Sequence, residues 1–273
     1  MGARNVIINI DSLDGYENFI SLISNDCKLT DPHFIYDNGN LYDAFKENNQ
    51  MVFASKQKDN VTGIFVWSII EEERYAEMII GFVQTKRAMY EMLDFMEENY
   101  TGYQADFVIN PQNDIIRSVL NEKKANFYTE QQRMIHNGKG IFADKECIEE
   151  YSPKWEEEYC SIHSTDRYWT AEKVLSAPDT FRVLLAIEQG KIVGYIDVTH
   201  CFDMNEPYDL YIKPENKRMG YEKALLESAL KYNNYKPMMV LVDVDNVEEI
   251  QLYESVGFET MKGQNSICVA YTL

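Results

Sequence analysis

Hydrophobic and polar positions alternate in two similar series along the chain. In the second series, short apolar runs predict strands at 181–187, 192–199, 208–213, 239–244 and 267–273. The apolar spacing predicts helices at 217–232 and 247–256. Gly190 suits the tight turn between the first two strands, and Pro214 ends the third because it cannot donate to a strand ladder. An aromatic-rich segment that we expect to be helical, 145–176, precedes this series.

The first series repeats this order. It predicts strands and helices at 51–55, 61–70, 75–83, 86–99, 105–109, 114–125 and 133–136. An offset of 131 places Gly63 on Gly194 and Phe127 on Phe258. The same offset makes Met89 the counterpart of Gly220, Val83 that of Pro214 and Glu122 that of Tyr253. We therefore expect two tandem α+β domains of the three-layer α/β type, residues 1–138 and 139–273, each with a mixed, largely antiparallel sheet flanked by helices.

Charge and cysteine content narrow the function classes. The formal net charge of the 273 residues is −19, so the surface should repel nucleic acid and favour cationic partners such as amines. The five cysteines form no C-x-x-C pair and no zinc-site spacing, which indicates a reducing, cytoplasmic location and no metal site. No apolar run reaches the ~20 residues of a membrane span, so we expect no membrane partner.

The chemically most specific stretch follows the third strand of the second series. A basic loop with Lys213, Lys217, Arg218 and Lys223 surrounds Gly220, directly before the predicted helix. The first amides of a helix lack internal partners and lie at the positive end of its dipole, so such a start suits phosphate oxygens. A simple strand–turn–helix junction with a glycine is the alternative.

A second motif, Asp243 to Phe258, runs strand–Asn–helix–Tyr–Gly–Phe. It resembles the signature of the GNAT superfamily of N-acetyltransferases, and Lys217-x-x-Gly220-x-Glu222 resembles the acetyl-CoA loop of that family. The resemblance covers about 181–273 strongly. Lys217 stands where the family has Arg or Gln, and Glu222 stands where it has a small residue. The offset counterparts in the first series lack the motif, so we expect a degenerate GNAT-like domain there.

This resemblance implies transfer of an acetyl group from acetyl-CoA to an amine of a small molecule or peptide. Backbone groups of Tyr211 and Ile212 would bind the pantetheine arm, and the pyrophosphate would lie on Arg218, Met219, Gly220, Tyr221, Glu222 and Lys223, beside Lys217. Tyr253 would protonate the leaving thiolate, and Asn246 would cap its helix, contact the cofactor, or both. Glu206 is the first candidate for the base, with Asp209, Asp197 and His200 behind it.

Other interpretations stay open. Trp155 and Tyr159 lie one helical turn apart among glutamates, which fits either a site for a cationic amine or an amphipathic helix with its aromatic side inward. Glu222 would repel a pyrophosphate. A non-catalytic protein that binds CoA or acyl-CoA, or an interaction protein that retains only the fold, is therefore the alternative to an enzyme.

Overall fold

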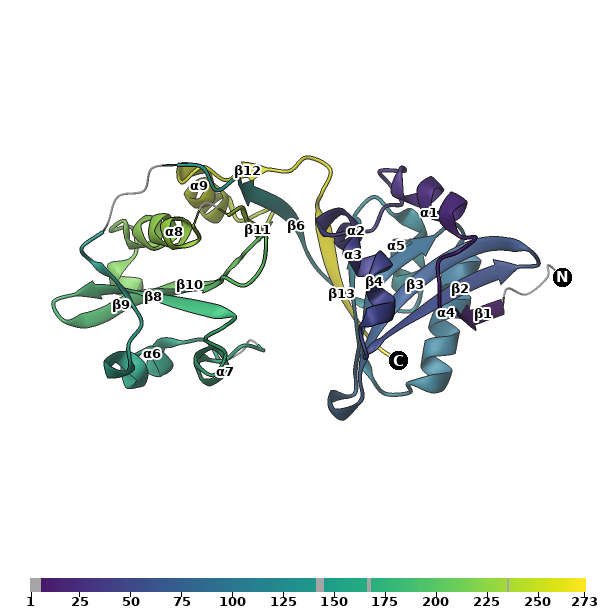
Figure 1. Cartoon of the computed structure of the whole chain (residues 1–273), viewed down its shortest axis with the longest axis horizontal. Coiled ribbons are helices and arrows are strands. Elements are labelled where there is room, and N and C mark those ends of the chain that lie inside the picture. The colour runs from purple at the N-terminus through teal and green to yellow at the C-terminus, as the bar shows by residue number, and fades with distance from the viewer. Residues whose placement is uncertain (1–5, 141–144, 166–167, 235) are drawn as a thin grey trace. The chain divides into compact units, whose positions relative to one another are not determined.

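The computed structural model describes residues 6–140, 145–165, 168–234 and 236–273 and contains two compact units (Figure 1). The first unit comprises residues 1–132 together with 262–273, and the second comprises residues 133–261. This division differs from the expected boundary at 138, because the last strand of the chain belongs to the first unit. Within the described segments, no helix is both long and apolar enough to cross a bilayer.

The first unit has one mixed sheet with helices. Along the sheet the strands are β1 (Val6–Asn9), β2 (Gln50–Gln57), β3 (Asn60–Ile70), β4 (Tyr75–Val83), β5 (Gln104–Ile109), β13 (Ser266–Thr272) and β6 (Asn126–His136). All neighbours are antiparallel except β4 and β5. The helices are α1 (Glu17–Ser24), α2 (Pro32–Tyr36), α3 (Gly39–Tyr42), α4 (Lys86–Asn99) and α5 (Asp114–Glu122).

The second unit has an antiparallel four-stranded sheet and a separate strand group. The sheet order is β10 (Pro207–Ile212), β9 (Lys191–Thr199), β8 (Phe181–Glu188) and β7 (Ile148–Glu150). The other strands are β11 (Met238–Asp243) and β12 (Glu259–Thr260), which both neighbour β6 in a nine-stranded sheet. The helices are α6 (Glu156–Ile162), α7 (Ala171–Leu175), α8 (Tyr221–Tyr232) and α9 (Val247–Ser255). The expected helical run at 145–176 was wrong, since it contains a short strand and two short helices.

Two strands explain why the boundary differs. β13 pairs with β5 and β6 inside the first unit, where Ile267 and Val269 are buried in its core. β6 begins in the first unit and ends in the second, where Ile135 pairs with Glu259 of β12. Each unit therefore depends on a strand that a division at residue 138 would assign elsewhere.

The repeat is real in element order, but its constant offset is wrong beyond the landmark glycines. Gly63 pairs with Val83 and Gly194 pairs with Ile212, so the ends of β4 and β10 correspond at an offset of 129. The N-caps of the following helices, Thr85 and Gly220, differ by 135. The second unit thus has a longer connection between this strand and helix.

Three predicted correspondences change as a result. Gly220 corresponds to Thr85 and not to Met89, which is fully buried in the core of the first unit. Ile212, not Pro214, takes the place of Val83. Tyr253 is the seventh residue of α9, and the seventh residue of α5 is Leu120, so Glu122 was also wrong.

Candidate functional site

The candidate site begins where two parallel strands of the second unit separate. β10 and β11 are linked at their starts by a single bridge between Asn205 and Met238, with Met239 N donating to Asn205 O at 2.9 Å. Beyond this bridge the strands belong to different sheets. A bulge at Tyr208, between the pairs of Pro207 and Asp209, marks the point of separation. The backbone edge of β10 is therefore open to a ligand along its second half.

The backbone of β10 points its polar groups alternately to β9 and to this gap. Lys213 N donates to Val193 O at 2.8 Å, so the backbone of Tyr211, two residues earlier, also faces β9. Leu210 and Ile212 consequently present their N–H and C=O groups to the gap. Of the two predicted arm-binding residues, Ile212 has the required orientation and Tyr211 does not. Leu210 was missed, although strand alternation could have identified it.

Helix α8 begins at this gap without a side-chain cap. Its N-cap is Gly220, which has φ +89° and open space where a Cβ would lie. The N-caps Thr85, Asn113 and Asn246 instead accept hydrogen bonds from the first turns of their own helices. Because a glycine cannot do this, the first amides of α8 remain available for anionic oxygens. The backbone amides at the start of α8 are therefore suited to bind a diphosphate.

The basic side chains near Gly220 contribute less positive charge to the start of α8 than the sequence suggested. Lys213 bonds Glu158 at 3.3 Å, Arg218 bonds Glu248 at 2.8 Å, and Lys223 donates to Ser255 O at 3.2 Å. Lys217 and Met219 are exposed. Glu222 lies in the first turn of α8 and is half-buried. The positive character of this helix start therefore comes mainly from its backbone, with a carboxylate beside it.

Asn246 and Tyr253 occupy helix α9. The Asn246 side chain accepts from Glu249 N at 3.3 Å and donates to the Glu249 carboxylate at 2.6 Å, so it caps the helix. Tyr253 is buried in the hydrophobic core of the second unit, with its ring 5.2 Å from that of Phe258 in an edge-to-face arrangement. This position suits both a packing residue and a hydroxyl held out of bulk water.

Glu206 lies directly before β10, one residue beyond the bridge at Asn205. Burial raises the pKa of its carboxyl above the ordinary value of 4.5, in spite of the opposing charge of Arg133. A half-buried carboxylate with a raised pKa is typical of a general base. His200, a weaker candidate, bonds Pro178 O through its ring at 2.9 Å.

The other two candidate bases point into a buried network. Asp197 accepts from Tyr159 Oη at 2.8 Å, and Asp209 accepts from Tyr195 Oη at 2.7 Å. His163 Nε2 lies 2.8 Å from Asp197 and 3.9 Å from Asp209. Since these hydrogen bonds already engage both carboxylates, Glu206 is the candidate that remains least committed.

The His163–Asp197 pair holds two protons at the imidazole nitrogens, one more than a neutral imidazole carries by itself. His163 Nδ1 lies 2.9 Å from Ser164 O, which can only accept, so Nδ1 carries a proton. The short contact of Nε2 with Asp197 needs a second proton between the two groups. Burial opposes charge on His163, but the Asp197 bond and the nearby carboxylates raise the imidazole pKa above its ordinary value. Burial also raises the pKa of Asp197.

The sequence predicted no metal constellation, but ligand atoms of His163, Asp197 and Asp209 gather within 4.8 Å of one another. Their hydrogen bonds to each other and to two tyrosines account for this grouping. The separation of 163 from 197 and 209 along the sequence hid the network. Tyr159, one of the two aromatic residues expected near the acceptor, is fully buried in it, which supports the amphipathic-helix interpretation.

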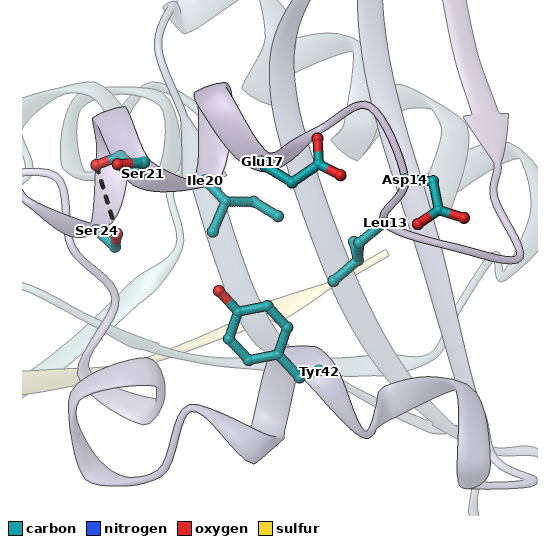
Figure 2. A pocket seen from close by; sticks show the side chains of 7 residues that line it. All are labelled: Leu13, Asp14, Glu17, Ile20, Ser21, Ser24 and Tyr42. Atoms are coloured by element: carbon teal, nitrogen blue, oxygen red, sulfur yellow. Dashed lines mark hydrogen bonds between the residues drawn. The ribbon is translucent and has the colours of Figure 1, made fainter.

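A separate pocket of about 300 Å³ lies in the first unit. Figure 2 shows its lining from α1, α3 and the segment before α1: Leu13, Asp14, Glu17, Ile20, Ser21, Ser24 and Tyr42. Ser24 Oγ donates to Ser21 O at 3.5 Å within α1. This pocket contains none of the predicted site residues.

The comparisons with known proteins find a family match inside the second unit. Residues 179–260, which include β8 to β12, match the family model described as an acetyltransferase (GNAT) domain. The matched segment contains the separated strands, the glycine-started helix and Tyr253, so the candidate site lies within the GNAT domain.

Solved structures extend the likeness in fold to most of the chain. A GCN5-related N-acetyltransferase from Sphaerobacter thermophilus is similar with a TM-score of 0.59 at 11% identity, over 82% of this chain and 80% of that one. A tandem GNAT protein from the clavulanic acid biosynthesis pathway gives 0.55 at 9% identity, over 98% of each chain. A GCN5-related N-acetyltransferase from Kribbella flavida gives 0.53 at 14% identity, over 78% and 88%.

At these identities the likeness concerns the fold alone, and it confirms the predicted fold of two tandem GNAT-like units. No curated protein matches the sequence. The second unit thus contains the segment that matches the acetyltransferase (GNAT) domain model, and the first unit has a GNAT-like fold without the glycine at the helix start.

Proposed function

We propose that the second unit is an acetyl-CoA-dependent N-acetyltransferase that acts on an amine of a small molecule or peptide. The observation that carries the proposal is the left-handed Gly220 at the uncapped start of α8, beside the separated strands β10 and β11. The strand edge at Leu210 and Ile212 offers hydrogen-bonding groups to an extended amide-containing arm. The amides of Tyr221, Glu222 and Lys223 would hold the diphosphate.

The residues of the chain would then move two protons. Bound acetyl-CoA supplies the acetyl group as a thioester. Glu206 accepts the proton that the attacking amine loses as the new C–N bond forms, directly or through water. Tyr253 donates its phenolic proton to the sulfur as the C–S bond breaks, because a phenol with an ordinary pKa of ~10 is protonated at neutral pH and has a proton to give. The acidic surface favours the approach of a cationic acceptor.

The test is the release of free thiol from acetyl-CoA with a panel of primary amines, polyamines and peptides. We expect Glu206→Gln to lower kcat at neutral pH and to leave CoA affinity unchanged, because the amide cannot take the proton. Asp203→Asn, at an exposed carboxylate in the same β9–β10 connection, is the matched control. Unchanged turnover in Glu206→Gln would assign the base to another residue.

A CoA-binding module without catalysis is the second candidate, favoured by Glu222 in the first turn of α8. A carboxylate there stabilises an empty helix start and repels a diphosphate. Calorimetric titration separates the two candidates: CoA binding without thiol release from any acceptor supports the module. If the chain binds no CoA at all, only an interaction role on this fold remains.

A further inference from the structure

The first unit keeps the strand geometry that forms the gap in the second. β4 and β5 are parallel partners over four residues, from Tyr75 with Gln104 to Met78 with Phe107. β4 then has a bulge at Ile79 between the partners of Val66 and Trp67. Ile79 lies four residues before Val83, and Tyr208 lies four residues before Ile212, so the two bulge residues correspond. Gly81 likewise holds the place of Leu210.

Two of the residues of β4 that face this gap already have partners from the chain itself. Gly81 N donates to Asp31 Oδ2 at 2.9 Å, and His33 Nδ1 donates to Ile79 O at 3.0 Å. Asp31 is 3% exposed, and its other oxygen accepts from His33 N at 2.9 Å. The side chains of Asp31 and His33, at the N-terminus of α2, therefore hydrogen-bond to the edge of β4 at Gly81 N and Ile79 O.

The segment 27–33 also hydrogen-bonds to residues that follow β5. Asn110, which directly follows β5, donates from its side-chain amide to Cys27 O at 2.9 Å and to Thr30 O at 3.1 Å. Asn113, the N-cap of α5, donates to Leu29 O at 3.5 Å. Asn110 and Asn113 are both buried. Residues 27–33 thus bond to both sides of the divergence of β4 and β5.

We propose that residues 27–33 are a built-in occupant of the gap in the first unit. Asp31 takes the N–H of Gly81, which corresponds to the N–H that Leu210 offers to a ligand in the second unit, and His33 takes the C=O of the bulge residue Ile79. Given the proposed function, the chain binds one CoA and not two. The stoichiometry rests on that function, but the occupancy of the gap does not. The carboxylate takes the Gly81 amide in place of an amide oxygen of the pantetheine arm.

The proposal is tested by hydrogen exchange of the full chain at pH 7.5, measured by mass spectrometry with single-residue resolution. Burial raises the pKa of Asp31 to about 6, so the side chain is ionised under these conditions. We expect the Gly81 amide to be protected without CoA, and added CoA to slow exchange at Leu210 and Ile212 but not at Gly81. Slower exchange at Gly81 with CoA would overturn the proposal.

A second experiment compares the Asp31→Ala variant with the unchanged chain. We expect it to speed exchange at Gly81 at least tenfold, whereas Asp37→Ala, an exposed aspartate that accepts only from nearby Gly39 N, should leave it unchanged. Unchanged exchange at Gly81 in Asp31→Ala refutes the occupant. Amides of Ile64 and Val66 on β3 report general unfolding, and if they also exchange faster, Asp31→Asn replaces Asp31→Ala in the comparison.

The two proposals fail in different ways. If CoA protects neither unit, the proposed function is wrong, while the Asp31 comparison still decides whether residues 27–33 fill the gap. If CoA protects Leu210 and Gly81 together, CoA binding by the second unit stands and the occupant is excluded.

Discussion

Replacing Gly220 by alanine tests the helix start most directly. At φ +89° an L-residue is strained by about 1–2 kcal/mol, and no atom lies within 4 Å of the added Cβ to cause a further clash. For a unit of this size we expect the melting temperature to fall by about 2–6 °C. If relief of the strain turns one amide of the first turn away from a diphosphate, the loss of one charged hydrogen bond of about 1.5–3 kcal/mol weakens CoA binding roughly 10- to 100-fold.

Gly190→Ala is the matched control, because Gly190 has φ +73°, also has open space at its Cβ, and lies in the β8–β9 turn of the same unit. Both variants should melt at similar temperatures, and calorimetric titration with CoA should show weaker binding in Gly220→Ala alone. Equal weakening in both variants would mean that general destabilisation, not the loop, controls affinity. Unchanged affinity in Gly220→Ala would refute the assignment of this helix start to the diphosphate.

Three further changes test other parts of the molecule. Tyr253→Phe should lower kcat by about 10²- to 10⁴-fold in the thiol-release assay with the CoA dissociation constant unchanged, and an active variant would make Tyr253 a packing residue. The raised pKa of His163 means that its contribution to stability is present below the ordinary value of 6.5 and is lost as pH rises through the folded value. Chemical denaturation of the second unit should therefore show falling stability with rising pH, and a persistent slope in His163→Gln would contradict this. Val269→Asp, at a side chain 1% exposed in β13, should cost on the order of 3 kcal/mol and make residues 1–132 sensitive to protease, unlike Thr272→Asp at the exposed end of that strand.

Local signals carried much of the prediction. The order of strands and helices after residue 50, the hairpin at Gly190, the cap at Asn246 and the glycine start of α8 follow from turn chemistry and apolar spacing, which act over a few residues. The start of α8 itself was placed four residues early, because the basic loop has no apolar pattern that distinguishes it from a first helical turn.

Long-range pairing was not accessible in the same way. Nothing in the alternation of 266–272 indicates whether this strand pairs with β5 or with β11, since either neighbour would bury Ile267 and Val269. The His163 network joins residues from three elements, so only the folded chain shows that Asp197 and Asp209 are engaged. A constant offset also concealed the longer connection before α8. The offset of 131 also places Lys86 and Arg87 on Lys217 and Arg218, but the first two lie in α4 and the other two in the loop before α8.

The position of β13 has a consequence for biosynthesis. The ribosome produces the first 132 residues early, yet the sheet they form lacks an internal member until residues 266–272 emerge. Domains of most proteins fold in the order of their synthesis, N-terminal domain first. Here the half translated first can be completed only after the acetyltransferase half has been made, and until then β5 and β6 expose unpaired edges to chaperones and to aggregation.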